Sequence, residues 1–262
     1  MIDRQEMKDY LALYAGQLPA IGSEGQLKLA ETAVHVSGVG RIGSMLLFNA
    51  VNAGVLRLSA NDPQVVEQEN VGHLIYARKC DIGKPKVHAM EEFLHGRPLL
   101  QFEGIYAPNE AEEVDRQYRE TDWIFSAANS VEARLRAERA GIVYGKPVMQ
   151  VAALDGREAW GGLITHRLPE NADWAGCFAD LLQPGTVFPR GEGLVTTITT
   201  ALAAIASNMF IQIITGVVDQ WVRKNNVFVV DLTSYGITPY AMRKRNGEPC
   251  KICGCKGRSE RS

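Results

Sequence analysis

The chain has 262 residues, and its 28 lysines and arginines nearly balance its 30 aspartates and glutamates. This balance excludes a broad basic face, so we expect neither nucleic acid nor an anionic membrane surface as a partner. The length is sufficient to bury a full hydrophobic core in one α/β domain. Residues 1–6 are polar with no apolar run behind them, which predicts no secretory signal and a cytoplasmic protein.

The first part of the chain predicts a strand, a glycine turn and a helix. Two short helices are expected before residue 31, with a break at 18–22, and an apolar run at 33–37 then predicts a strand. The turn 38–44 (GVGRIGS) and the apolar stretch 45–51 follow. This order is typical of a loop that binds the phosphates of a nucleotide.

Each glycine of this turn has a distinct expected role. Gly38 permits the tight turn, Gly40 lets the backbone approach a phosphate, and Gly43 lets the helix pack close to the strand. The helix N-terminus supplies free N–H groups and the positive end of a dipole. Asp62 follows the next apolar run, about twenty residues after the turn, where a ribose hydroxyl is expected to bind.

Strands and helices continue to alternate up to about residue 153. Strands are expected at 55–58, 99–105, 122–126 and 147–152, and helices from 85, at 111–119 and at 131–140. This alternation predicts an α/β fold with a Rossmann-like, doubly wound, mostly parallel sheet. We expect a single domain over residues 1–262, made of N-terminal helices (1–30), a nucleotide-binding core (31–155) and a C-terminal part (156–262) of longer loops, one apolar helix and a cysteine-rich tail.

The apolar stretch 194–218 has no charged residue and is long enough to cross a bilayer. Polar residues are nevertheless scattered through it, among them Thr197, Ser207, Asn208 and Gln212. A buried helix in the core or in a dimer interface is therefore the preferred interpretation, and no membrane partner is expected.

These segments resemble, in order, the ThiF/MoeB/HesA-type adenylyltransferases, the ubiquitin-activating-like enzymes that activate ubiquitin-like proteins and sulfur carriers. The matching segments cover most of the chain. They are 14–26 (YAGQLPAIGSEGQ), 38–44, Asp62, Asn70, 81–86 (DIGKPK), Asn129 with Arg134, 145–147 (GKP) and 250–254 (CKICG).

The resemblance implies a reaction, its cofactors and its partners. An acceptor carboxylate attacks the α-phosphate of ATP and expels pyrophosphate, with ATP and Mg²⁺ as cofactors and a homodimer as the working form. The acceptor is a small carrier protein, a peptide or a small carboxylic acid. Lys86 is implied to face the developing phosphate charge, and Asp62, Asn70 and Asn129 to contact the nucleotide. A solvated surface lysine and a turn-forming asparagine are the alternatives for Lys86 and Asn70.

Several positions depart from the family pattern. Gly16 replaces the arginine that reaches the neighbouring ATP across the dimer, and His73 replaces a loop arginine. Ala128 stands where an aspartate is expected to hold Mg²⁺. The family's thiol would fall near Arg190, so no thioester step is expected.

Basic residues nearby offer partial compensation. Arg41 replaces a glycine in the phosphate loop, and Arg78 and Lys79 lie in the same loop as His73. We consider Arg41 and His73, with Lys86, as candidate catalytic residues. An Arg41 that faces water and a purely structural His73 stay open as alternatives.

The resemblance also implies a partial zinc knuckle, in which Trp174 replaces one family cysteine. Cys177, Cys250, Cys253 and Cys255 supply four thiolates for a structural zinc site, with free thiols as the alternative. Such clustering suits a reducing compartment better than a secreted disulfide framework.

Three functions compete. The first is ATP-dependent adenylation of a carboxylate without a thioester step, in cofactor or peptide natural-product biosynthesis. The second is a catalytically degenerate relative that binds a peptide or partner enzyme. The third is a nicotinamide oxidoreductase, although no residues resemble a hydride-transfer site.

Overall fold

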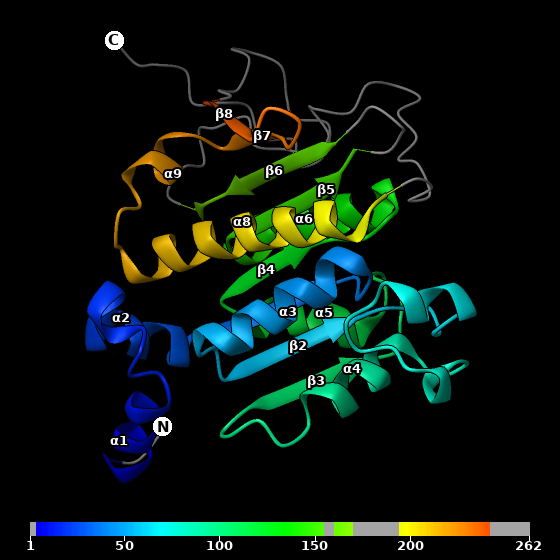
Figure 1. The fold of residues 1–262 in the computed structure, drawn as a ribbon, viewed down its shortest axis with the longest axis horizontal. Helices are drawn as coiled ribbons and strands as arrows, with labels where there is room; N and C mark the ends of the chain where they lie inside the picture. Colours follow the sequence, from blue (N-terminus) through cyan, green and yellow to red (C-terminus); the bar gives the residue numbers. More distant parts are fainter. Residues whose placement is uncertain (1–3, 155–159, 170–193, 242–262) are drawn as a thin grey trace.

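The computed structural model describes residues 4–154, 160–169 and 194–241. Within these residues the centre of the molecule is one eight-stranded sheet in the order β3-β2-β1-β4-β5-β6-β7-β8 (Figure 1). Its strands are β1 (Ala33–Ser37), β2 (Arg57–Asn61), β3 (Gln101–Ile105), β4 (Trp123–Ser126), β5 (Val148–Ala153), β6 (Gly161–Arg167), β7 (Val227–Asp231) and β8 (Gly236–Tyr240).

The first five strands are parallel, and the last three extend the same sheet in antiparallel fashion. The chain enters at β1 and builds outward in both directions, so the predicted doubly wound, mostly parallel fold is confirmed. The prediction of long loops after residue 153 was incomplete, because it missed β6, β7 and β8. β6 opens with two glycines and β8 contains Pro239, and both residue types are read as loop signals in a sequence.

Helices cover both faces of the sheet. They are α1 (Arg4–Leu13), α2 (Leu18–Glu31), α3 (Arg41–Ala53), α4 (Lys86–Leu94), α5 (Glu112–Glu120), α6 (Val131–Tyr144), α8 (Thr196–Thr215) and α9 (Gln220–Lys224), with the 3₁₀ turns η1 (Gln68–Gly72) and η2 (Lys79–Asp81). In Figure 1, α3 and α8 cross the near face of the sheet, whereas α5 and α6 lie behind it.

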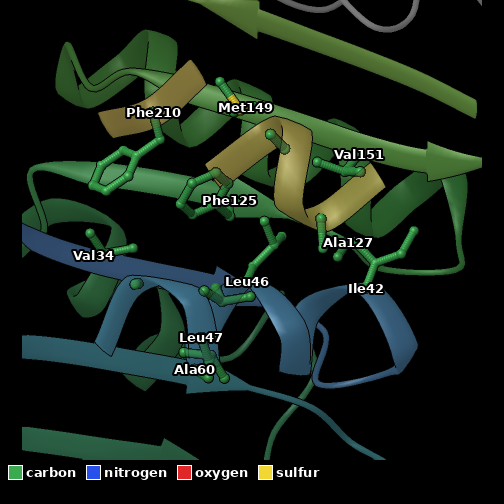
Figure 2. Packing of buried hydrophobic residues seen from close by; sticks show 14 of the residues in the cluster. Val34, Ile42, Leu46, Leu47, Ala60, Phe125, Ala127, Met149, Val151 and Phe210 are labelled. Atoms are coloured by element: carbon green, nitrogen blue, oxygen red, sulfur yellow. The ribbon is translucent and has the colours of Figure 1, made fainter. Parts of the chain in front are cut away.

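The largest part of the core lies between the sheet and the layer of α3 and α8. Figure 2 shows Phe210 of α8 beside Phe125 of β4, and their ring centroids are 5.4 Å apart. Leu46 and Leu47 of α3 are fully buried in the same cluster. The other face of the sheet has a smaller apolar cluster around Val114. The neighbouring strands β1 and β2 also carry buried polar side chains, among them His35 and Ser59.

α8 is the apolar helix that the sequence predicted. Among the described helices it is the one long and apolar enough to cross a membrane by length and composition. Its side chains Leu202, Ala206 and Phe210 are buried against the sheet, and Asn49 of α3 donates to Ser207 at 3.2 Å. It is therefore a core helix, as expected.

The N-terminal helices are fastened to the end of α3. The hydroxyl of Tyr10 donates to the carbonyl of Gly54 at 2.8 Å, and Gln26 donates to the carbonyl of Ala53 at 2.8 Å. The two helices are separated at residues 14–17, before the expected break at 18–22, which lies inside α2 and is reduced to a kink at Gly22, where φ is +71°.

Candidate functional site

A cleft of about 230 Å³ opens at the carboxyl ends of β1, β2 and β4. β1 pairs with both β2 and β4, and the direction of winding changes between β1 and β4. Ligands of open α/β sheets bind at this switch point. The lining residues are Gly38, Gly40, Asn61, Asp62, Pro63, Gln64, Pro108, Asn109, Glu110, Ala127, Ala128, Asn129, Ser130 and Ala133.

The glycine loop forms one wall of this cleft. Gly38 has φ of +90°, and Gly43 lies so close to it that an added Cβ would be 1.7 Å from the carbonyl oxygen of Gly38. A Cβ on Gly40 would meet nothing within 4 Å. The loop is therefore tightly packed at Gly43 and has open space at Gly40. This space leaves room for a phosphate at the N-terminus of α3.

Two side chains outside the loop hold its central residue, Val39. The Val39 N–H donates to Asp62 Oδ2 at 2.7 Å, and the hydroxyl of Tyr76 donates to the Val39 carbonyl at 2.9 Å. Sequence reasoning missed Tyr76, because a single tyrosine in an irregular segment gives no signal of its partner.

Asp62 occupies the predicted position at the end of β2. Its second oxygen, Oδ1, accepts the N–H of Gln64 at 2.9 Å. Burial raises the pKa of this carboxyl, while Lys86 and the two backbone N–H groups partly oppose that shift. The Oδ2 atom of Asp62 thus supports the glycine loop through Val39, and Asp62 also lines the cleft.

Lys86 is the first residue of α4 and is bound to the segment that follows β2. Its backbone N–H donates to the carbonyl of Gln64 at 2.9 Å, and its Nζ donates to Gln64 Oε1 at 2.7 Å. The side chain is largely buried, so the surface-lysine alternative does not describe it. Lys86 is not among the lining residues, and its ammonium group is bound to Gln64, which is one of them.

Arg41 and His73 lie near Lys86. Burial lowers the pKa of His73, and the neighbouring cations Arg41 and Lys86 lower it further. Arg41 Nη1 donates to the carbonyl of Leu194, directly before α8, at 2.9 Å. The three candidate catalytic residues are therefore close enough to interact electrostatically, through His73.

The other basic residues of the crossover loop have different roles. Arg78 and Lys84 both bind the buried carboxylate of Asp81, at 2.9 and 3.1 Å. The hydrogen bond from Arg78 contributes most to keeping the pKa of Asp81 well below its usual range. Compensation by Arg78 for the absent family arginine is thus disfavoured, because its guanidinium stabilises the loop.

Asn70 has a structural contact of its own. Its Oδ1 accepts the N–H of Glu67 at 3.0 Å and completes a capping box at η1. This bond supports the turn-forming interpretation of Asn70.

The end of β4 forms the opposite wall. Ala127, Ala128 and Asn129 line the cleft, and Ser130 caps α6 through the N–H of Ala133 at 3.0 Å. This wall has no carboxylate, and the carboxylates that line the cleft are Asp62 and Glu110. Asn129 is exposed and free to face a ligand from its predicted position.

A buried polar chain supports the floor of the cleft and was not predicted. His35 binds Ser59 at 2.8 Å and Asn61 at 3.0 Å, and Asn61 donates to Asn109 Oδ1 at 2.7 Å. Asn109 in turn donates to the carbonyl of Ala133 at 2.9 Å. Burial lowers the pKa of His35 to about 4, so the ring is neutral at pH 7.

The predicted zinc ligands Cys177, Cys250, Cys253 and Cys255 lie outside the described residues, as does Arg190. Within the described ranges no group of three or more histidine, cysteine or acidic side chains is placed to hold a metal ion. A larger cleft of about 370 Å³, at the opposite ends of β1 and β2, is lined by none of the predicted site residues.

The ThiF family matches residues 14–255 of the chain. The chain is 24% identical to protein HesA of Leptolyngbya boryana over 90% of its own length and 82% of that protein. It is 23% identical to the sulfur carrier protein adenylyltransferase of Thermus thermophilus, over 90% and 88%. Among solved structures, E. coli MccB with MccA-N7isoASN has a TM-score of 0.74 at 14% identity, over 94% of this chain and 75% of that one. E. coli MccB has also been solved with ATP.

Proposed function

Because the chain belongs to the ThiF family, we propose that it is an ATP-dependent adenylyltransferase that activates a carboxylate. The observation that carries the proposal is the cleft at the switch point. One wall is the glycine loop, which packs tightly at Gly43 and leaves open space at Gly40, with Asp62 beside it and Lys86 bound to the lining residue Gln64. This arrangement suits a nucleotide whose phosphates lie at the N-terminus of α3 and whose ribose lies toward Asp62.

The proposed reaction joins an acceptor carboxylate to AMP. A carboxylate oxygen forms a bond with the α-phosphorus of ATP, the bond from that phosphorus to the bridging oxygen breaks, and pyrophosphate leaves. Positioning and cations that face the developing negative charge supply most of the catalysis in such a transfer. Lys86 would provide one such charge, and Arg41 and His73, grouped beside it, would provide further donors.

Magnesium would enter with ATP, held by the phosphate oxygens. Mg²⁺ commonly binds through one or two carboxylates together with substrate phosphates. The wall formed by Ala127, Ala128 and Asn129 offers no carboxylate. The donors present at β4 therefore do not fit a magnesium site held by the protein, and we assign no step to such a site.

The acceptor is proposed as a small carrier protein, a peptide or a small carboxylic acid, without a thioester step. The Thermus thermophilus relative, a sulfur carrier protein adenylyltransferase, supports the carrier. The fold shared with MccB, which was solved with MccA, supports a peptide acceptor. Homodimer formation, a structural zinc held by Cys177, Cys250, Cys253 and Cys255, and a cytoplasmic location stay predictions from the sequence.

Calorimetry with ATP and Mg²⁺ tests the proposal. The parent protein is expected to bind ATP with micromolar affinity, and Lys86→Ala is expected to weaken binding at least tenfold, about 1.4 kcal/mol. Lys8→Ala, which removes an exposed lysine from α1, is the control and should bind as the parent does. A parent protein that does not bind ATP would contradict the proposal. If the parent binds ATP, pyrophosphate exchange that depends on an added carboxylate would identify the acceptor.

A second candidate function is a degenerate relative that binds a partner without ATP. The apolar wall at Ala127 and Ala128 favours it, because the family's magnesium carboxylate is absent there. Partner binding that is equally tight with and without ATP would support this second function.

A further inference from the structure

The ammonium group of Lys86 has one hydrogen-bond partner among the described residues, the amide oxygen of Gln64. Resting on the proposed function, we propose that Gln64 is the positioning residue that presents Lys86 to the phosphates of the nucleotide. It does so with a neutral group that leaves the charge of the lysine available to the ligand.

The backbone fixes the two residues relative to each other before their side chains meet. Gln64 accepts the backbone N–H of Lys86 at 2.9 Å, and Val65 forms an isolated antiparallel bridge with Pro85. The N–H of Gln64 is itself bound to Asp62 at 2.9 Å. The segment after β2 thus connects the cleft carboxylate to the first residue of α4.

The side chains then set the direction of the ammonium group. Lys86 Nζ is 2.7 Å from Gln64 Oε1, and Gln64 lines the cleft whereas Lys86 is not among its lining residues. A lysine ammonium has three donors, so one bond to Gln64 leaves two for phosphate oxygens. The lysine side chain has many rotamers, and this bond reduces the number that must be frozen when a phosphate binds.

The neutral partner matters because the carboxylate of Asp62, which interacts with Lys86, already accepts other hydrogen bonds. Asp62 interacts electrostatically with Lys86 and also accepts two backbone N–H groups. A carboxylate at position 64 would pair with the same ammonium and repel the phosphates. The amide of Gln64 accepts a hydrogen bond from Lys86 without cancelling its charge.

A double-mutant cycle tests the role of Gln64. Gln64→Met keeps the length of the side chain and removes the acceptor, and it is made in the parent and in Lys86→Ala. Calorimetry measures binding of ATP with Mg²⁺ and binding of adenosine, which has no phosphates. In the parent background we expect ATP binding to weaken about fivefold, while adenosine binding stays within twofold. In the Lys86→Ala background the same change is expected to alter ATP binding less than twofold.

Two further variants sharpen the result. Gln64→Glu keeps an acceptor but adds a charge, and ATP binding is expected to weaken more than in Gln64→Met. Gln68→Met changes an exposed glutamine in the same crossover loop and should leave both ligands unaffected. Equal losses in the two backgrounds, or equal losses for ATP and adenosine, would overturn the role of Gln64. A parent protein that binds no ATP would overturn the proposed function, and this role with it.

Discussion

The two walls of the cleft, at the ends of β1 with β2 and at the end of β4, differ in the groups that they offer to a ligand. The first wall combines the glycine loop, Asp62 and, through Gln64, Lys86. The second presents Ala127, Ala128 and Asn129, with no carboxylate among them. The first wall suits binding of the phosphates and ribose, whereas the second lacks a protein ligand for a metal ion. If the proposed function holds, changes in the first wall should alter nucleotide binding, and changes in the second should alter its dependence on Mg²⁺.

The largest effect is expected inside the first wall, at Gly43. Gly43→Ala would place a methyl group 1.7 Å from the carbonyl oxygen of Gly38. We expect the free energy of unfolding to fall by about 3 kcal/mol and ATP binding to be lost. Urea denaturation and calorimetry measure the two effects.

Gly40→Ala is the matched control for this change, because its new methyl group would meet nothing within 4 Å. It should cost less than about 1 kcal/mol of stability and still weaken ATP binding, since the methyl group would occupy the space expected for a phosphate. Equal stability losses in the two variants would show that the loop is not packed as described.

The second effect concerns the polar chain beneath this wall. Burial lowers the pKa of His35 from 6.5 to about 4, so the unfolded chain binds a proton more readily than the folded one between these values. The stability contributed by neutral His35 is present above pH 6.5 and is lost as the pH falls toward 4. From His35 alone we expect the free energy of unfolding to fall by about 2 kcal/mol between pH 7 and pH 5.

Urea denaturation at these two pH values checks the effect of His35. In His35→Gln, the free energy of unfolding is expected to fall about 2 kcal/mol less between pH 7 and pH 5 than in the parent. The variant is expected to be less stable than the parent at pH 7. His88→Gln, at an exposed histidine of α4, is the control and should follow the parent. A pH dependence in His35→Gln as steep as in the parent would exclude His35 as the group that titrates.

The third effect addresses the second wall. Ala128→Asp adds a carboxylate beside the loop, where Ala128 lines the cleft. We expect Mg²⁺ to strengthen ATP binding by at least tenfold more in this variant than in the parent, about 1.4 kcal/mol, because the metal ion gains a protein ligand. Calorimetry with and without Mg²⁺ measures the difference, and Ala128→Asn is the control of equal size without charge. An identical Mg²⁺ dependence in all three proteins would show that the wall is not within reach of the metal ion.

Local patterns explain which parts of this comparison were predictable from the sequence. The strand, the glycine turn and Asp62 follow one another closely, so hydrophobic periodicity and glycine spacing predicted them. Asn61 and Asn109 are 48 positions apart, and their bond exists only after β2 and the segment beyond β3 have been brought together. The direction of Arg41 depends on the carbonyl of Leu194, 153 positions away. No local pattern encodes such pairs, because tertiary packing creates them.

The smallest effect is expected at the hydrogen bond from Tyr76 to the carbonyl of Val39. Tyr76→Phe removes a hydroxyl that lies 2.9 Å from that carbonyl and leaves the buried ring in place. We expect a loss of about 1 kcal/mol in the free energy of unfolding, because the carbonyl of the buried Val39 loses a hydrogen bond. ATP binding should weaken two- to threefold, since Val39 then keeps Asp62 as its one side-chain partner among the described residues. Tyr14→Phe removes a comparable hydrogen bond, to Val51 at 3.0 Å, at the far end of α3. It should cost similar stability and leave ATP binding unchanged, so an equal loss of binding in both variants would mean that general stability, and not the loop, controls the affinity.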